Sequence, residues 1–237
     1  MAREQLSEPA YSWNGFAGRQ DLAAALAGNV AARLTKAIDE RGTALLAVSG
    51  GTTPAKFFAA LSTIPIAWNK VTVTLVDERF VPASSPRSNA GLVAANLLQN
   101  AAAAAQFVPM YHEAASIETA AASDMALKAL AWPLDVVVLG MGGDGHTASF
   151  FPDADNLSDL LDPASRRIVL PVHAPSGGEP RLTLSMARII AAGFIALHIE
   201  GEDKRTAFED AMGPGAKKPI RKVLEAAPIP VEVFWAP

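Results

Sequence analysis

Asp144 and His146 stand two residues apart in a glycine-rich loop whose composition can support proton transfer. A carboxylate beside an imidazole can set the tautomer of the ring and raise its basicity. Four of the six positions from 140 to 145 are glycine, which indicates a backbone in conformations that other residues resist. An exposed polar loop is the simpler alternative, but the glycine density favours function. We therefore take Asp144 and His146 as candidate catalytic residues.

The segment 49–54, with the sequence SGGTTP, has the composition of an anion-binding turn. Gly50 and Gly51 let the backbone approach a ligand closely, and a helix predicted to begin at the end of the segment would add free N–H groups. The hydroxyls of Ser49 and Thr52 are further donors. The segment is not a P-loop, because the GxxxxGK[ST] spacing is missing. A tight turn with a helix cap remains an equally good interpretation.

Three cations and a carboxylate complete the set of candidate site residues. Asp77 and Arg79 directly follow the apolar segment 71–76, where an acid and a guanidinium can bind a ligand or transfer a proton. Arg181 opens a predicted strand. Lys204 lies in the first turn of a predicted helix, where the helix dipole disfavours a cation unless an anion binds nearby. Solvated loops and surface ion pairs are the alternatives.

Strands and helices alternate along most of the chain. This order predicts an α/β fold, a three-layer, Rossmann-like sandwich with a mainly parallel sheet and helices on both faces, in a single domain over 1–237. In such sheets ligands bind beyond the carboxyl ends of the strands, where the candidate residues fall. The predicted strands are 44–48, 71–76, 107–110, 134–140, 167–172, 181–184, 193–199 and 231–235. The predicted helices are 20–40, 54–62, 88 through the Ala-rich stretch 101–105, 116–130, 202–212 and 217–226.

The composition narrows the class of protein. Half of the 237 residues are hydrophobic, which suffices for a sizeable core, and the net charge of −4 suggests neither nucleic acid nor an anionic membrane as partner. The start, MAREQLSEPAYSW, lacks the apolar region of a secretory signal, and no apolar run approaches the length of a membrane span. We expect a cytoplasmic protein of undetermined oligomeric state. With no cysteine, thiolate nucleophiles and cysteine metal sites are excluded.

No motif predicts a metal or a cofactor. The four histidines (112, 146, 173 and 198) are scattered, and there is no HExxH and no GxSxG nucleophile motif. His198 lies in an apolar strand, which favours a core residue over a ligand, and His173 stays unassigned. The glycines at 140, 142 and 145 match GxGxxG. Pro152 follows too soon for the long helix of a dinucleotide site, and no acid ends the strand 167–172.

Taken together, the motifs resemble the 6-phosphogluconolactonase family over nearly the whole chain. The matching segments, in the order of that family, are SGGTTP at 49–54, DERFVP at 77–82, SN at 88–89, GMGGDGHTASFFP at 140–152, PRLTLS at 180–185 and GEDKR at 201–205. The resemblance implies a sugar-phosphate isomerase-like fold. It also implies hydrolysis of a small phosphorylated sugar lactone, 6-phosphoglucono-δ-lactone, to 6-phosphogluconate in the pentose phosphate pathway, without metal or cofactor.

The resemblance also implies roles for the candidate residues. His146 would activate water and later return the proton to the leaving oxygen, with Asp144 holding the ring. Arg79, Arg181 and Lys204 would grip the phosphate together with the backbone of 50–53. Asp77 corresponds to a proton-abstracting base in related deaminases, and here it would orient substrate hydroxyls. Backbone N–H groups near 50–52 or 142–145 are candidates for stabilising the oxyanion.

Two other functions stay open. Glucosamine-6-phosphate deaminases share this fold, but they carry a glutamate five residues past the histidine, where this chain has Phe151, and commonly a tyrosine in place of Arg79. Both differences favour the lactonase. A non-catalytic sugar-phosphate-binding module would need an output domain, and the sequence contains no helix-turn-helix or linker to supply one.

Overall fold

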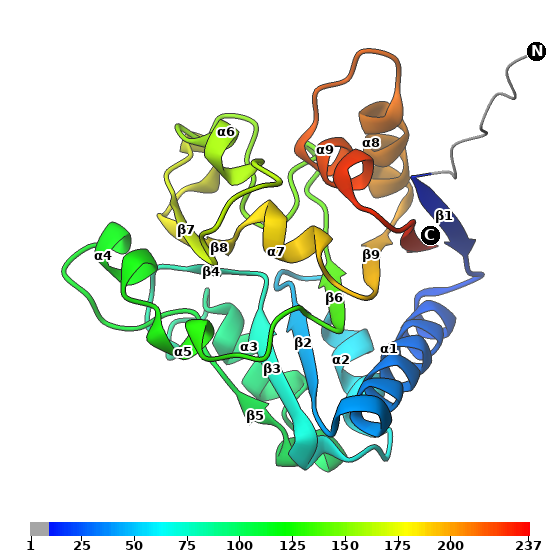
Figure 1. Cartoon of the computed structure of the whole chain (residues 1–237). Helices are drawn as coiled ribbons and strands as arrows, with labels where there is room; N and C mark the ends of the chain where they lie inside the picture. The colour runs from blue at the N-terminus through cyan, green and yellow to red at the C-terminus, as the bar shows by residue number, and fades with distance from the viewer. Residues whose placement is uncertain (1–9) are drawn as a thin grey trace, which may run out of the picture.

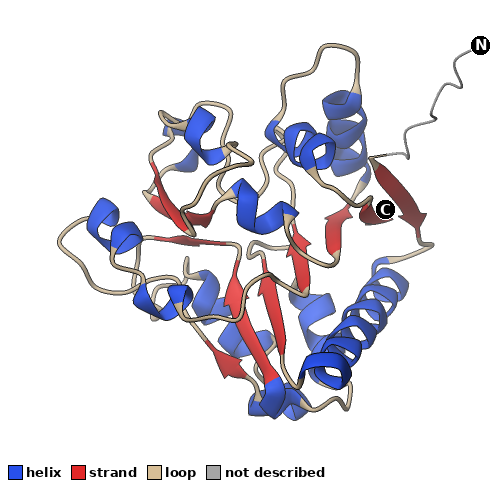
Figure 2. Cartoon of the chain, viewed as in Figure 1, coloured by secondary structure: helices blue, strands red, loops and turns tan. Residues whose placement is uncertain are grey.

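The computed structural model of the chain describes residues 10–237, in which a large parallel sheet is joined to a small antiparallel one (Figures 1 and 2). The strands of the large sheet are, in spatial order, β1 (Tyr11–Gly15), β10 (Val231–Ala236), β9 (Ile195–Glu200), β6 (Val136–Leu139), β2 (Ala44–Val48), β3 (Val71–Leu75) and β5 (Gln106–Phe107). Every pairing in it is parallel. The predicted α/β class with a mainly parallel sheet is therefore confirmed.

Helices lie on both faces of the large sheet and beyond its ends (Figure 1). They are α1 (Arg19–Arg41), α2 (Ala55–Ser62), α3 (Asn89–Asn96), α4 (Ile117–Ala122), α5 (Met125–Lys128), α6 (Leu157–Leu160), α7 (Met186–Ile190), α8 (Glu202–Met212) and α9 (Pro219–Ala226). Short 3-10 turns occupy η1 (Trp68–Lys70), η2 (Asn100–Ala104) and η3 (Pro175–Gly177). Within residues 10–237, no helix has both the length and the apolar composition that crossing a membrane requires.

The longest helix, α1, follows the periodicity of the sequence. Leu22, Leu26, Val30 and Leu34 form one stripe and are all fully buried against the sheet. The helix ends at Gly42, whose φ of 83° is left-handed and whose N–H donates to the carbonyl of Ile38. The predicted helix 20–40 and its glycine stop are thus confirmed.

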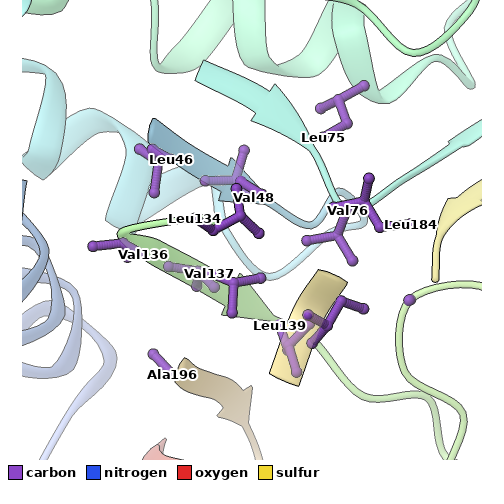
Figure 3. Close-up of a cluster of buried hydrophobic side chains, with 14 of the residues drawn as sticks. Leu46, Val48, Leu75, Val76, Leu134, Val136, Val137, Leu139, Leu184 and Ala196 are labelled. Carbon is purple, nitrogen blue, oxygen red and sulfur yellow. The ribbon is translucent and has the colours of Figure 1, made fainter. Parts of the chain in front are cut away.

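The central strands β2 and β6 are buried along their whole length, as their continuous apolar sequences predict. Figure 3 shows the resulting cluster, in which Leu46 and Val48 of β2 pack with Val136, Val137 and Leu139 of β6. Each such side chain contributes roughly 1.5–3 kcal/mol when it is fully buried. This rigid core fixes the strand ends from which the site loops leave.

The order of the strands reverses between β2 and β6. From β2 the chain moves outward to β3 and β5, and it then returns to β6 on the other side of β2. The loops after β2 and β6 therefore leave the sheet side by side. In open α/β sheets this reversal is where ligands bind.

A small antiparallel sheet was not predicted. It contains β4 (Asp77–Arg79), β8 (Arg181–Leu184) and β7 (Val169–Val172), so two segments predicted as strands belong to it rather than to the parallel sheet. Val76 joins the two sheets: its N–H donates to Val48 in the large sheet and its carbonyl accepts from Leu184 in the small one. The strand β1 and the short helices α6 and α7 were also not predicted.

Two predicted helices are shorter than expected. The helix that begins after Ser88 ends at Asn96, Gln99 is extended, and the alanine tract forms the separate 3-10 turn η2, in which Asn100 has a left-handed φ of 50°. The predicted helix 116–130 is broken into α4 and α5 at Asp124, whose carboxylate caps α5 by accepting from the N–H of Leu127.

Four smaller predictions differ from the structure or lie partly outside the described residues. The predicted strand 107–110 is β5, which is shorter and one residue earlier. Pro54 caps α2 instead of opening it. The interpretation of the first nine residues as lacking a leader, and the boundary 1–237 of the predicted domain, lie partly outside the described residues and stay predictions.

Candidate active site

One pocket of about 190 Å³ lies at the carboxyl ends of β2 and β6, where the strand order reverses. Side chains and loops from both sheets line it. It gathers nearly all of the site residues predicted from the sequence: Ser49, Gly50, Gly51, Thr52, Asp77, Arg79, His146, Arg181 and Lys204. Asp144 does not line the pocket and lies behind His146.

The turn after β2 is tied to the loop after β6. Ser49 donates its N–H to the carbonyl of Val138, and its hydroxyl accepts from the N–H of Gly140 at 3.2 Å. Gly50 must be glycine, because a Cβ there would lie 1.8 Å from Oδ1 of Asn89. The turn is thus a wall of the pocket as well as the connection into α2, and the tight-turn and ligand-binding interpretations are compatible.

His146 is held in its loop by two contacts with Asp144. The distance from Nδ1 of His146 to Oδ1 of Asp144 is 2.6 Å, and the backbone N–H of His146 donates to the same oxygen at 3.1 Å. The loop closes through the N–H of Gly142, which donates to the carbonyl of His146. Gly142 also leaves room for the ring, since a Cβ there would lie 2.2 Å from it.

The Asp144–His146 contact orients the imidazole. Burial opposes ionisation of Asp144, but the backbone N–H and the ring of His146 outweigh it and lower the pKa of Asp144. A carboxylate that accepts from Nδ1–H leaves Nε2 as the ring nitrogen available to a ligand. The His146 side chain is 27% exposed and lines the pocket, so this nitrogen is accessible.

Asp77 is a buried carboxylate at the junction of the two sheets. Its Oδ2 accepts from the hydroxyl of Ser149 at 2.6 Å and lies 3.8 Å from Nη1 of Arg181. Ser149 follows the histidine loop, so Asp77 connects that loop to the small sheet. Sequence reasoning did not single out Ser149, whose type is too common to give a signal.

Arg79 and Arg181 are brought together by the pairing of β4 with β8, in which they are register partners. Nη1 of Arg79 donates to the carbonyl of Arg87 and to Oδ1 of Asn89, at 2.6 and 3.2 Å. Nη2 of Arg181 donates to the carbonyl of Gly177 at 3.1 Å. The Nε atoms of both arginines are buried, and no acceptor within residues 10–237 reaches either of them.

Lys204 approaches the pocket from the first turn of α8, as predicted. It is half-buried, and no hydrogen bond or ion pair from the described residues holds its ammonium group. A Cβ on Gly143 would lie 3.9 Å from its Nζ, which places the lysine beside the histidine loop. The pocket therefore combines three cations with the Asp144–His146 pair.

Glu78, between Asp77 and Arg79, faces away from the pocket and is fully buried. Its carboxylate accepts from four donors at 2.8–2.9 Å: the backbone N–H groups of Arg79, Asn89 and Ala90, and the hydroxyl of Ser88. Burial raises the pKa of Glu78, and these four hydrogen bonds oppose part of the rise. Glu78 thus fixes the start of α3 against β4.

From the sequence, Asn89 belongs only to the Ser-Asn pair of the family resemblance and to the helix predicted from 88, and it does more in the structure. Ser88 is the N-cap of α3, and Asn89 is its first residue. The Nδ2 of Asn89 donates to the carbonyl of Asp77 at 2.8 Å, while its Oδ1 accepts from Arg79. Asn89 therefore holds Arg79 at the pocket, a role with no local signal in the sequence.

The other histidines lie apart from the Asp144–His146 pair. His198 is 3% exposed and 3.1 Å from Oε1 of Glu200, which confirms a core residue, although the ring also lines the pocket. His173 contacts Glu118 and His112 contacts Ser123, both at the surface. Among residues 10–237, no three histidine, aspartate or glutamate side chains gather as metal ligands would.

The glycines at 140, 142 and 145 do not open a helix. After Gly145 the chain continues through turns, and the next helix, α6, begins only at Leu157. This glycine loop therefore does not lead into a helix N-terminus of the kind on which a dinucleotide pyrophosphate rests.

Comparison with known proteins finds a family and relatives that match nearly the whole chain. The family described as Glucosamine-6-phosphate isomerases/6-phosphogluconolactonase matches residues 17–235. A Mesorhizobium japonicum protein named 6-phosphogluconolactonase is 78% identical, with 100% of both chains covered. A Rhizobium meliloti protein of the same name is 52% identical over 94% of this chain and 97% of its own.

Solved structures agree with the sequence relatives. The crystal structure of a 6-phosphogluconolactonase from Shewanella baltica OS155 superimposes with a TM-score of 0.90 and 36% identity. The match covers 96% of this chain and 98% of that one. The arrangement of both sheets is therefore that of a whole, known enzyme fold.

Proposed function

Because the chain belongs to the glucosamine-6-phosphate isomerase/6-phosphogluconolactonase family, we propose that it hydrolyses 6-phosphoglucono-δ-lactone to 6-phosphogluconate. The names of its relatives support this activity. The observation that carries the proposal is that Arg79 and Arg181, register partners in β4 and β8, line the same pocket as His146. A phosphate would pair with the two guanidinium groups, and His146 would meet the lactone at the other end.

The reaction begins with water attack. Nε2 of His146 takes a proton from a water molecule as its oxygen bonds to the lactone carbonyl carbon. A tetrahedral oxyanion forms, and when it collapses the bond from that carbon to the ring oxygen breaks. The imidazolium returns its proton to the leaving oxygen, and the new carboxylic acid ionises, so one proton is released per turnover. A positioned base of this kind typically contributes about 10²–10⁴-fold to the rate.

Asp144 supports this cycle in both of its halves. Its contact with Nδ1 keeps Nε2 free to accept the proton, and its negative charge stabilises the imidazolium that forms. Asp77 is held by Ser149 and lies near Arg181, which suits a role in orienting substrate hydroxyls. Backbone N–H groups of 50–52 or 142–145 are the candidate donors to the oxyanion.

The phosphate is the part of the substrate that the site uses for positioning. Arg79, Arg181 and Lys204 supply charge, and the 50–53 turn supplies backbone donors. The lactone carbonyl is already electrophilic, so a fixed distance between phosphate and carbonyl contributes much of the remaining advantage. No step in this mechanism requires a metal ion or a cofactor.

The test uses purified protein and freshly prepared 6-phosphoglucono-δ-lactone, because the compound also opens in buffer. Acid release is followed for the wild type and for His146→Ala side by side. We expect acceleration by the wild type and a nearly complete loss in the variant, with an unchanged circular dichroism spectrum. Equal rates for the two proteins would remove His146 from the mechanism. Ammonia release from glucosamine 6-phosphate, with no lactone hydrolysis, would assign the deaminase activity instead.

A further inference from the structure

Phe151 contacts both halves of the proposed active site from behind the pocket lining. It follows the histidine loop and is 3% exposed. The centre of its ring is 4.3 Å from that of His146, with a tilt of 35° between the planes. The guanidinium carbon of Arg181 lies 5.0 Å from the centre of the same ring. One aromatic side chain therefore contacts both the proton-transferring group and one of the cations.

The contact with Phe151 completes the positioning of His146. The hydrogen bond to Asp144 fixes one edge of the imidazole, but a single bond leaves the ring free to rock about its axis. The side chain is 27% exposed, so the ring keeps one open side toward the pocket. The face of Phe151 blocks the rocking from one side, so the two contacts together define where Nε2 points.

The same ring supports Arg181. The guanidinium has one hydrogen bond to the carbonyl of Gly177, and Asp77 is 3.8 Å away, beyond hydrogen-bonding distance. A guanidinium within about 6 Å of an aromatic centre is attracted by the ring. Gly177 lies beside the edge of Phe151, since a Cβ built on it would lie 3.3 Å from Cε2 of the ring.

We propose that Phe151 is a positioning residue that fixes His146 and Arg181 relative to each other. The base and the phosphate-binding cation then keep the separation that the lactone requires. This inference rests on the proposed function. Phe151 does not itself touch the reacting atoms. It acts by limiting the movement of two groups that do, and it therefore affects both kcat and KM.

The experiment compares Phe151→Leu with Phe150→Leu. The two phenylalanines are neighbours, both are buried, and neither lines the pocket, but only Phe151 has a ring contact with His146 and Arg181. For Phe151→Leu we expect kcat to fall about 10-fold and KM to rise about 5-fold. For Phe150→Leu we expect both constants within about 2-fold of the wild type, at a comparable loss of thermal stability. Equal kinetic constants in the two variants would overturn the proposal.

A second measurement keeps this inference separate from the proposed activity. The imidazole ¹⁵N shifts of His146 report its tautomer in the free protein, with no substrate present. We expect a protonated Nδ1 in the wild type and in Phe150→Leu, and a mixture of tautomers in Phe151→Leu. Unchanged shifts in Phe151→Leu would refute the positioning role. An inactive wild type with the expected shifts would instead refute the lactonase activity alone.

Discussion

Arg79 and Arg181 lie directly opposite each other in the antiparallel pair β4–β8, so their side chains leave the same face of the small sheet. Like charges in this arrangement destabilise a sheet. Burial lowers the pKa of Arg181; the charge of Asp77 opposes this, and that of Arg79 adds to it. In the proposed function, a dianionic phosphate bound between the guanidinium groups would offset this repulsion.

Replacing Arg181 by alanine is expected to weaken substrate binding more than turnover. Loss of a charge-assisted contact to phosphate costs about 1.5–3 kcal/mol, or roughly 10–100-fold in KM. Calorimetric titration with 6-phosphogluconate measures the same loss without turnover. Arg188→Ala is the matched control, since Arg188 also stacks on an aromatic ring, that of Trp132, but lies outside the pocket. Wild-type affinity in Arg181→Ala would contradict the phosphate assignment.

Asp144→Asn is expected to lower kcat by about 10²-fold or more, with little change in KM. The amide can donate to Nδ1 and thereby stabilise the wrong tautomer, and it removes the charge that stabilises the imidazolium. Steady-state kinetics test this directly. Asp153→Asn is the control, because Asp153 also accepts two hydrogen bonds, from Ser176, but does not line the pocket. Equal kcat values in the two variants would argue against a role for Asp144.

The pH dependence of stability follows from the same residue. The pKa of Asp144 is lowered in the folded protein, so its stabilising contribution is present above its unfolded pKa, about 4, and is lost as the pH falls through the lower folded value. The difference in Tm between the wild type and Asp144→Asn should therefore be largest near neutral pH and shrink in acid. A Tm difference that grows on acidification would show that the pKa of Asp144 is raised, not lowered, in the folded protein.

Gly142→Ala tests the space that the histidine ring occupies. A Cβ at this position would lie 2.2 Å from the ring of His146 and 2.6 Å from Oδ1 of Asp144. We expect the ring to be displaced and kcat to fall by about 10²-fold, as for an error of about 1 Å in position. Affinity for 6-phosphogluconate should change little, since Arg79 and Arg181 are untouched. In Gly143→Ala the new Cβ meets only Nζ of Lys204, at 3.9 Å, and near-normal turnover is expected.

Glu78→Gln tests the anchor between β4 and α3. Glutamine keeps one acceptor oxygen but turns an amide N–H₂ toward donors, which costs about 1–3 kcal/mol of stability. Because the pKa of Glu78 is raised in the folded protein, its protonated form contributes to the free energy of unfolding. This contribution is present below the pKa of the unfolded state and is lost as the pH rises through the pKa of the folded state. Urea unfolding across pH should show a lower, flatter profile in the variant. Glu118→Gln, at an exposed position, should have little effect on stability at neutral pH.

Exhaustive chelation is expected to leave lactone hydrolysis intact, because the proposed base and donors are all protein groups. The enzyme is dialysed against a strong chelator and assayed at once, with metal content measured in parallel. A lost rate that a single metal ion restores would overturn the metal-free mechanism.

Local features of the sequence determined the main helix and the central strands of this protein. Helix α1 follows from its i, i+4 apolar stripe and its glycine stop, and strands β2 and β6 follow from their continuous apolar runs. These patterns are repeated along each element, so they can be read from the sequence alone. The SGGTTP and DGH motifs could be placed at strand ends because the apolar runs before them predict strands. Because parallel strands end at one edge, their convergence followed from the predicted order of elements.

Only the tertiary structure decided how the site residues meet. The small sheet arises because the chain turns at Val76 and pairs with a segment about a hundred residues later, and this pairing alone sets Arg79 opposite Arg181. The need for glycine at position 50 depends on Asn89, and the environment of His146 depends on Phe151. The first two relationships join residues that are far apart in the sequence, so they exist only once the strands have found their register; the third depends on how the loop after β6 folds back on itself.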